Sequence, residues 1–503
     1  MVMTTETRVR FCRYVRVCRP SSHRVCIGCA FSHRELANPP RGVAVQRTMT
    51  LLIQALDAIR SAARPRARVR NRAASVAAAA VAALAITASR GGAQPAGPNE
   101  FSYRVAIEAG QKAEAAHDEA AARDDYVRAL TLMKGHPDVV YLIARSEARL
   151  GHADAAVARL RTIAAMGLAY PIDHDSAFAT LRGHEDFEAV RTAMAGNRSA
   201  ISTATVTHVL ADTNMLAEDL AYDPGSRTFY VSSIHRGIIV AVPENGPVHD
   251  FVPAGRDNVY GIMALAIDTR HGALWATTSA MPQADGYKPS DSGRSAVLRY
   301  ELSTGRLLRR FDAPRDGRSH NLGDMTVDQN GTVVVSDGVS GDIYTVRAGR
   351  DTLETLVARG TFRSPQTPAV LPDGRVLVAD YALGLAVIDR QDGTVTWVQH
   401  PDTTAVNGID GMYVDGHMLY AVQNGTSPER VVRFTLDSRY ANVTGWKVIE
   451  RGSPGLGDPT HGVLTADGFY FLGNSGWDRF DDNGSIKAGA ASPPTILRAP
   501  LTS

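Results

Sequence analysis

The feature that most constrains the fold is a short pattern that recurs six times between residues 220 and 474. Each copy has an alternating apolar run, a turn containing Asp and Gly, and a second apolar run, as in MYVDGHMLYAV (412–422). Such alternation around an Asp/Gly turn is typical of a β-hairpin. The copies lie at 220–233, 265–278, 325–337, 369–380, 412–424 and 463–474, with their turn aspartates 42 to 60 residues apart. This spacing is close to the length of a four-stranded propeller blade, so the sequence predicts a mainly β fold, a six-bladed β-propeller over residues 203–501.

The ends of this region indicate how the ring closes. After the sixth hairpin only one further strand, TILRAPL (495–501), remains, whereas the run TATVTHVLA (203–211) precedes the first hairpin. We expect the early run to supply the missing outer strand of the last blade, because an unpaired strand edge is a liability.

Residues 101–197 form a separate region that is rich in Ala and has helical periodicity. The stretches HDEAAARDDYVRAL (117–130) and GHADAAVARLRTIA (151–164) align at an offset of 34 residues, which is the tetratricopeptide period. We therefore predict a small N-terminal all-α, tetratricopeptide-like domain, with 178–190 as a capping helix. It either binds a protein partner or serves as a short helical cap on its neighbour, since peptide-binding solenoids normally need three or more repeats.

The first 93 residues have the composition of a targeting segment. The basic stretch RPRARVRNR (64–72) precedes the Ala-rich run AASVAAAAVAALAITA (73–88) and a small-residue cleavage pattern near Ala93. We interpret residues 49–93 as a signal peptide, residues 1–48 as an over-extended or disordered N-terminus, and the protein as periplasmic or secreted. The run is too short to favour a permanent membrane span. N-terminal sequencing of exported protein should find a mature chain that starts near Gln94; recovery of residues 1–48 would contradict this.

Charge and cysteine content exclude two further classes of function. Residues 1–90 contain 16 Arg, no Lys and three acidic residues, so the remaining 413 residues carry 38 basic and 49 acidic groups. An acidic body argues against nucleic-acid binding, which needs clustered Lys and Arg. All four cysteines, Cys12, Cys18, Cys26 and Cys29, precede residue 49, so the predicted domains have no thiol chemistry.

The hairpins also predict where a site would lie. The first strand of each hairpin lines the central channel of a propeller, so the residues just ahead of these strands converge at one mouth. Three carboxylates occupy such positions, and like charges aimed at one axis repel unless a cation binds between them. Oxygen ligands favour Ca²⁺, with Mg²⁺ or Mn²⁺ as alternatives, over zinc. The six positions are Glu218, Met263 or Gly261, Asp324, Gln366 or Thr367, Asp410, and Thr460 or His461.

Three segments, AEDLAYD, DMTVDQNGTVVVSDG and DGMYVDGHMLYAV, resemble the gluconolactonase/senescence-marker-protein family of six-bladed propellers. The resemblance implies one divalent cation in the channel. It makes Glu218 a metal ligand, and Asp410 both a metal ligand and the catalytic base. The family's metal-binding Asn is absent from QTPAVLPD (366–373), so Gln366 or Thr367 would replace it. In GDMTVD (323–328) the substrate-binding aspartate, Asp324, is retained, but Gly323 stands where the family has Asn.

Together these features predict a cation-dependent hydrolase of lactones or related esters. Two long insertions, 279–296 and 473–494, should flank the mouth, with Trp477 and Tyr287 as stacking surfaces and His461 as a further substrate contact. The alternative is a non-enzymatic, cation-stabilised propeller that binds a ligand or protein partner at the same mouth.

Overall fold

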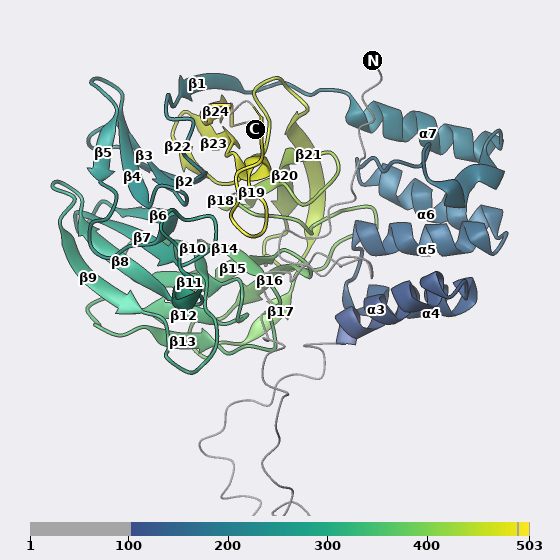
Figure 1. Ribbon diagram of the computed structural model, residues 1–503, viewed down its shortest axis with the longest axis horizontal. Helices are drawn as coiled ribbons and strands as arrows, with labels where there is room; N and C mark the ends of the chain where they lie inside the picture. Colours follow the sequence, from purple (N-terminus) through teal and green to yellow (C-terminus); the bar gives the residue numbers. More distant parts are fainter. Residues whose placement is uncertain (1–101, 490–491, 502–503) are drawn as a thin grey trace, which may run out of the picture. The chain divides into compact units, whose positions relative to one another are not determined.

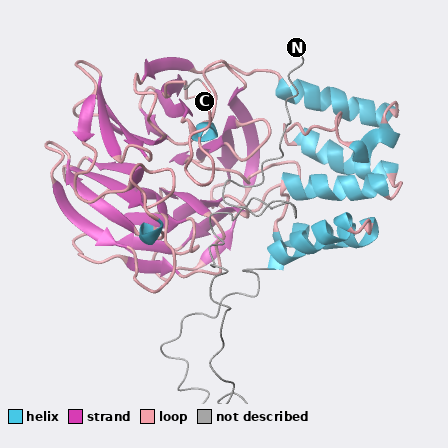
Figure 2. Cartoon of the chain, viewed as in Figure 1, coloured by secondary structure: helices cyan, strands magenta, loops and turns pink. Residues whose placement is uncertain are grey.

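The computed structural model describes residues 102–489 and 492–501. The predictions for residues 1–48 and for the signal peptide at 49–93 therefore lie outside the described residues. Within that part of the chain, no helix is both long enough and apolar enough to span a bilayer. Figure 1 shows the order of the helices and strands, and Figure 2 separates the helical region from the strands.

The strands form six antiparallel four-stranded sheets, which are the blades of the predicted propeller. The first three blades are β2 (Ala217–Asp223), β3 (Thr228–Ser233), β4 (Ile238–Pro243) and β5 (His249–Val252); β6 (Gly261–Asp268), β7 (Ala273–Ser279), β8 (Ser295–Glu301) and β9 (Leu307–Asp312); and β10 (Leu322–Val327), β11 (Val333–Asp337), β12 (Ile343–Val346) and β13 (Glu354–Val357). The last three are β14 (Pro365–Val370), β15 (Val376–Asp380), β16 (Gly384–Ile388) and β17 (Val395–Trp397); β18 (Met412–Asp415), β19 (Met418–Gln423), β20 (Arg430–Leu436) and β21 (Val443–Arg451); and β22 (Gly462–Thr465), β23 (Gly468–Asn474), β24 (Thr495–Ala499) and β1 (Thr205–Val209).

The predicted ring closure is confirmed by the last sheet, whose strand order is β1-β24-β23-β22. Strand β1 pairs antiparallel with β24, with Thr205 opposite Arg498. The inner strands β2, β6, β10, β14, β18 and β22 contact one another in that order, and β22 contacts β2. The ring is therefore closed by the strand that precedes the first hairpin.

All six predicted hairpins are the inner strand pairs of the blades, but the turn at 412–424 lies one residue later than the Asp-Gly motif suggests. Asp415 pairs with Met418, so the two-residue turn is Gly416-His417. Gly416 has a φ of +59°, a conformation that glycine adopts at little cost. Glycine at the first turn position therefore determines this register.

Apolar side chains fill the space between neighbouring blades. Leu377 and Leu385 of the fourth blade belong to the same buried cluster as Leu419 and Phe434 of the fifth. Burial of such large side chains contributes about 1.5–3 kcal/mol each relative to exposure. This packing holds the inner strands, and the loops that lead into them, in fixed positions.

The N-terminal region consists of α3 (Ser102–Ala115), α4 (Glu119–Leu132), α5 (Pro137–Arg149), α6 (Ala153–Ala165), η1 (Ser176–Leu181) and α7 (Glu185–Arg198). Helix α6 begins 34 residues after α4, the offset seen in the sequence. The single capping helix predicted at 178–190 is instead divided into the 3₁₀ turn η1 and α7. Gly183, with a φ of +85°, separates the two elements, because this backbone conformation cannot continue a right-handed helix.

A buried base, His136, precedes helix α5 and a buried acid, Asp138, lies in its first turn, and their effects on the pH dependence of stability oppose each other. Burial raises the pKa of Asp138, which accepts a hydrogen bond from the Tyr170 hydroxyl, to about 6, and lowers the pKa of His136 to about 4. Asp138 therefore loses stabilisation as the pH rises from about 4 to about 6. His136 loses stabilisation as the pH falls from about 6.5 to about 4.

The substitution Asp138→Asn should remove only the first of these two dependences. The unfolding free energy of the variant, relative to that of the wild type, should rise with pH between about 4 and 6 by at most about 1.4 kcal/mol per pH unit. Urea unfolding of both proteins at three pH values in this window measures the difference. A difference that does not change with pH would contradict the assignment.

Candidate functional site

The predicted mouth residues are all buried where the inner strands begin. Their side chains come from five blades, because each residue lies at the start of an inner strand or just before it. Their exposed fractions lie between 3 and 7%: Glu218, Asp324, Gln366, Thr367, Asp410 and His461.

Asp324 and His461 form a buried ion pair across the ring. The Nε2 atom of His461 donates a hydrogen bond to Asp324 Oδ1, and Nδ1 donates to the backbone carbonyl of Glu218 at 3.0 Å. Burial alone would lower the pKa of His461, but the charges of Asp324 and Asp410 raise it well above its ordinary value. His461 is therefore positively charged at neutral pH, with both ring nitrogens acting as donors.

This pairing differs from the arrangement that the sequence suggested, in which three unpaired carboxylates face one another. Asp324 already has a cationic partner, although its burial still raises its pKa. Glu218 and Asp410 also accept hydrogen bonds, from Trp477 and Asn424 respectively. Of the three carboxylates, that of Asp324 is hydrogen-bonded directly to the charged His461 ring.

Asp410 is held in place by an asparagine that sequence reasoning missed. Asn424 Nδ2 donates to Asp410 Oδ2 and, at 2.8 Å, to the carbonyl of Pro459. The Tyr381 hydroxyl donates to Asn424 Oδ1 at 2.9 Å. Asn424 directly follows β19, one residue after Gln423, whose place at the end of the second strand is occupied by Asp337 in β11 and Asp380 in β15. A polar residue just after the second strand of the hairpin is the sequence signal that could have identified Asn424.

Thr367 links the fourth blade to both acidic residues. Its hydroxyl lies 2.8 Å from the backbone carbonyl of Asp410 and 3.1 Å from Asp324 Oδ1. The amide nitrogen of neighbouring Gln366 donates to the Ser364 carbonyl at 3.2 Å and to its hydroxyl at 3.1 Å. The Gln366 amide is thus oriented by its nitrogen, and Oε1 is its atom suited to bind a cation.

Glu218 is in contact with one of the long insertions. Trp477, in η3 (Trp477–Arg479), donates from Nε1 to Glu218 Oε2 at 2.6 Å. The two insertions also contact each other, because Gln283 Nε2 donates to the Asp481 carbonyl at 3.2 Å. Tyr287, by contrast, is partly exposed and makes a turn within its own loop, where its backbone N–H donates to Ala284.

Asp219 is a further buried residue, after Asn424, that the sequence analysis did not single out. Its oxygens accept hydrogen bonds from the backbone N–H groups of Leu220 and Leu265, both at 2.7 Å, so it joins the first two blades. Burial raises the pKa of Asp219 to about 7. The charges of His461 and Asp324 also act on this pKa, so Asp219 lies close to the same buried cluster.

The predicted ligand residues offer hard oxygen atoms, which is the ligand type that divalent cations such as Ca²⁺ prefer. Glu218 and Asp410 supply carboxylates, Gln366 an amide oxygen and Thr367 a hydroxyl. Among the residues that the structure describes, no group of three or more His, Cys, Asp or Glu side chains is placed to hold a metal ion. The predicted set contains only two such side chains, so it is a weaker and less charged site than an all-carboxylate one.

The fold and the site thus define a six-bladed β-propeller with a buried ionisable cluster where its inner strands begin. No protein-family model matches the sequence, and the comparison with curated proteins also gives no match. Similar solved structures include propellers of the gluconolactonase and regucalcin kind.

Three of these structures show that the similar propellers have different functions. A gluconolactonase from Xanthomonas campestris is 16% identical, with 60% of this chain and 98% of that chain covered and a TM-score of 0.38. The calcium-binding protein regucalcin from Agrobacterium tumefaciens is 16% identical, with 59% and 95% covered and a TM-score of 0.40. An aldose sugar dehydrogenase from Streptomyces coelicolor, solved with PQQ bound, is 14% identical, with 60% and 98% covered and a TM-score of 0.40. At these identities neither an activity nor a ligand can be transferred, and the six-bladed fold rests on the sheet order of this chain.

Proposed function

We propose that this protein hydrolyses lactones or related esters at the channel mouth and that it requires a divalent cation. The observation that carries the proposal is the buried cluster of Asp324, Thr367, Asp410 and His461. It combines the Asp324 carboxylate, the Thr367 hydroxyl, the Asp410 backbone carbonyl and the charged His461 imidazole, from four blades, in one hydrogen-bonded group. The pKa values of Asp324 and His461 are both raised, and buried groups with such shifts are typical of catalytic sites.

In this mechanism Asp410 is the general base. Its carboxylate removes a proton from a water molecule as the water oxygen bonds to the carbonyl carbon of the substrate. The ring C–O bond then breaks, and the leaving oxygen takes up the proton that Asp410 had accepted, which gives the hydroxy acid. Asn424 fixes the orientation of the base, because its amide donates to Asp410 Oδ2.

The other residues bind and orient the substrate. The positive charge of His461, held by Asp324, favours the negative charge that develops on the carbonyl oxygen. Trp477 offers an apolar face beside Glu218 for the carbon skeleton of the substrate. Export to the periplasm or beyond, which we infer from the predicted signal, would place this activity on substrates outside the cytoplasm.

Glu218, Asp410, Gln366 and Thr367 would hold the cation, and Ca²⁺ suits this oxygen-rich set best. When bound, a divalent cation polarises a carbonyl group and lowers the pKa of nearby water. The proposal is tested by assaying the wild type on aldono- and alkyl-lactones with Ca²⁺, Mg²⁺ or Mn²⁺ and after chelation. Hydrolysis of at least one lactone that stops on chelation supports it.

The alternative function is a binding propeller without turnover, and one observation favours it. Each predicted carboxylate already has a hydrogen-bond donor within the protein, and none is more than 7% exposed. Some of these hydrogen bonds would have to break before the carboxylates could bind a substrate, which disfavours turnover at this site. Absence of hydrolysis across the lactone panel, with cation bound, would favour this second function.

Cation binding itself should stabilise the protein. A ligand at a hundredfold excess over its dissociation constant adds about 2.7 kcal/mol to the unfolding free energy, so the melting temperature should rise with Ca²⁺ and fall with chelator. Glu218→Gln keeps an acceptor for Trp477 but removes a charge, and should reduce the Ca²⁺-dependent shift. The exposed Glu244→Gln is the matched control. A melting temperature that responds to neither Ca²⁺ nor chelator would contradict the cation site.

A further inference from the structure

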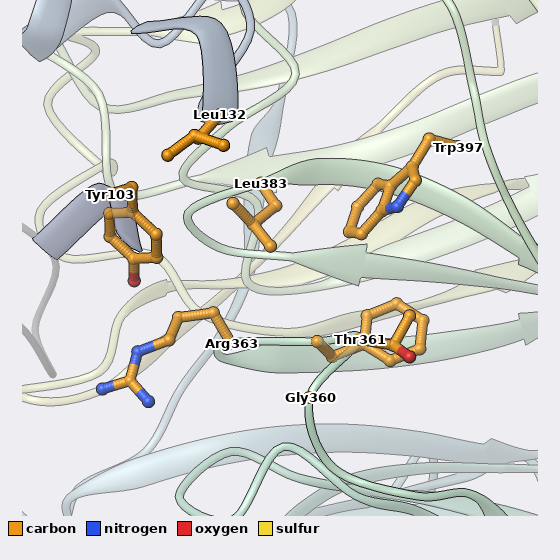
Figure 3. A pocket seen from close by; sticks show the side chains of 8 residues that line it. Tyr103, Leu132, Gly360, Thr361, Arg363, Leu383 and Trp397 are labelled. Carbon is orange, nitrogen blue, oxygen red and sulfur yellow. The ribbon is translucent and has the colours of Figure 1, made fainter. Parts of the chain in front are cut away.

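A cavity of about 270 Å³ lies away from the channel mouth, between the helical region and the fourth blade (Figure 3). It is formed by the first two helices, the segment before β14, the loop between β15 and β16, and the end of β17. None of its lining residues belongs to the candidate catalytic site. They are Tyr103, Leu132, Gly360, Thr361, Phe362, Arg363, Leu383 and Trp397.

One end of this cavity is polar and carries an excess of positive charge. Tyr103 is 4% exposed, and neither its hydroxyl nor Arg363 Nε makes a hydrogen bond with another described residue. Burial raises the pKa of Tyr103, while the charges of Arg363 and Arg104 lower it. Arg104 thus lies near the phenol, although no hydrogen bond of normal geometry joins them.

The nearest carboxylate does not neutralise these two arginines. Asp380, which also influences Tyr103, accepts hydrogen bonds from four backbone N–H groups, those of residues 363, 364, 382 and 383. No salt bridge of Arg104 or Arg363 occurs within the described residues. Arg363 lines the cavity and Arg104 lies near it, whereas the one carboxylate that acts on Tyr103 already accepts four hydrogen bonds, so this end of the cavity is suited to a single anionic group.

The other end is aromatic. The Trp397 and Phe362 rings lie 5.7 Å apart, and Leu383 and Leu132 complete the apolar wall. In Figure 3 the side chains of Tyr103 and Arg363 lie on one side of the cavity and Trp397 on the other. An engineered cavity of about 150 Å³ holds benzene, so the larger space here fits one aromatic ring with a short side chain.

We propose that this cavity binds a small aromatic carboxylate, such as an arylacetate. The carboxylate would accept hydrogen bonds from Arg363 and the Tyr103 hydroxyl, and the ring would lie against Trp397 and Phe362. Tyr103 belongs to α3, whereas the remaining contacts belong to the propeller, so the ligand would join the helical region to the fourth blade. The inference does not depend on the proposed hydrolase activity.

Calorimetric titration of the full-length protein with phenylacetate and indole-3-acetate tests this inference, with phenylacetamide as the uncharged probe. At least one acid should bind, and at least tenfold more tightly than phenylacetamide. Arg363→Met should weaken binding of that acid at least tenfold, and Tyr103→Phe should weaken it to a smaller extent. Arg359→Met, an exposed residue of the same segment, should have no effect.

A second variant keeps the test valid if Arg363→Met fails to fold. Leu383→Trp adds volume to the apolar wall and should abolish binding while leaving the Arg363 charge in place. Failure of both acids to bind the wild type would overturn the proposal. Equal binding of phenylacetamide, or normal binding by both the Arg363 and Leu383 variants, would also overturn it.

Discussion

Asp410→Asn should lower the turnover of the protein on any lactone it hydrolyses by roughly 10²–10⁴-fold, the usual contribution of a general base. Asn has nearly the same size as Asp, and its side-chain oxygen can still accept the hydrogen bond from Asn424. It cannot, however, accept a proton from water. The loss should therefore appear in kcat, and the circular dichroism spectrum and most of the thermal stability should be unchanged.

Asp415→Asn is the matched control, because Asp415 belongs to the same hairpin and has the same charge but is exposed at its turn. This variant should retain wild-type kcat. If Asp410→Asn also retains wild-type kcat, the enzyme would stand but Asp410 would not be its base. If the wild type shows no turnover, Asp410→Asn should only weaken cation affinity, as expected for a binding propeller.

The blade count and the ring closure were predictable because they depend on local patterns. The alternation around each Asp/Gly turn specifies a hairpin, and the repeat length specifies a four-stranded blade. The strand at 205–209 was predictable because only one other strand follows the last hairpin. Both inferences need the order of residues along the chain and no knowledge of side-chain partners.

The electrostatic pairing within the site was not predictable to the same extent. The sequence places Asp324 and His461 at the same mouth, but 137 residues apart, and nothing in their local motifs indicates that they pair. The contact between Trp477 and Glu218 depends on how a long insertion folds back over the ring. Such long-range contacts are set by the packing of blades, which no local pattern encodes.

This pairing changes the electrostatic reason for a cation. Because the positively charged His461 is paired with Asp324, the three carboxylates do not face one another unpaired, and repulsion among them does not by itself require a cation. The charge of Asp410 also acts on His461, so the imidazolium serves both aspartates. The proposed cation dependence therefore rests on the oxygen-rich ligand set of Glu218, Asp410, Gln366 and Thr367.

Arg430→Met should lower the unfolding free energy by about 3 kcal/mol or more, because each buried acceptor that loses its donor costs about 1–3 kcal/mol. Arg430 is 1% exposed and joins the helical region to the propeller. Its Nη1 donates to the Met166 carbonyl at the end of α6 at 2.8 Å, and its Nε donates to Gln423 Oε1 at 2.9 Å. The guanidinium also lies 5.3 Å from the centre of the Trp446 ring.

The loss of stability in Arg430→Met should be concentrated where the helical region meets the propeller. Burial and the charge of Arg451 lower the pKa of Arg430 to about 9, so the side chain is still charged at neutral pH. Its positive charge interacts favourably with the partial negative charge at the C-terminus of α6. Hydrogen exchange of Arg430→Met should therefore accelerate in α6 and much less in the inner strands. Arg439→Met, an exposed residue after the same strand, should leave exchange and melting temperature unchanged. If α6 exchanges equally slowly in Arg430→Met and wild type, Arg430 does not hold the two regions together.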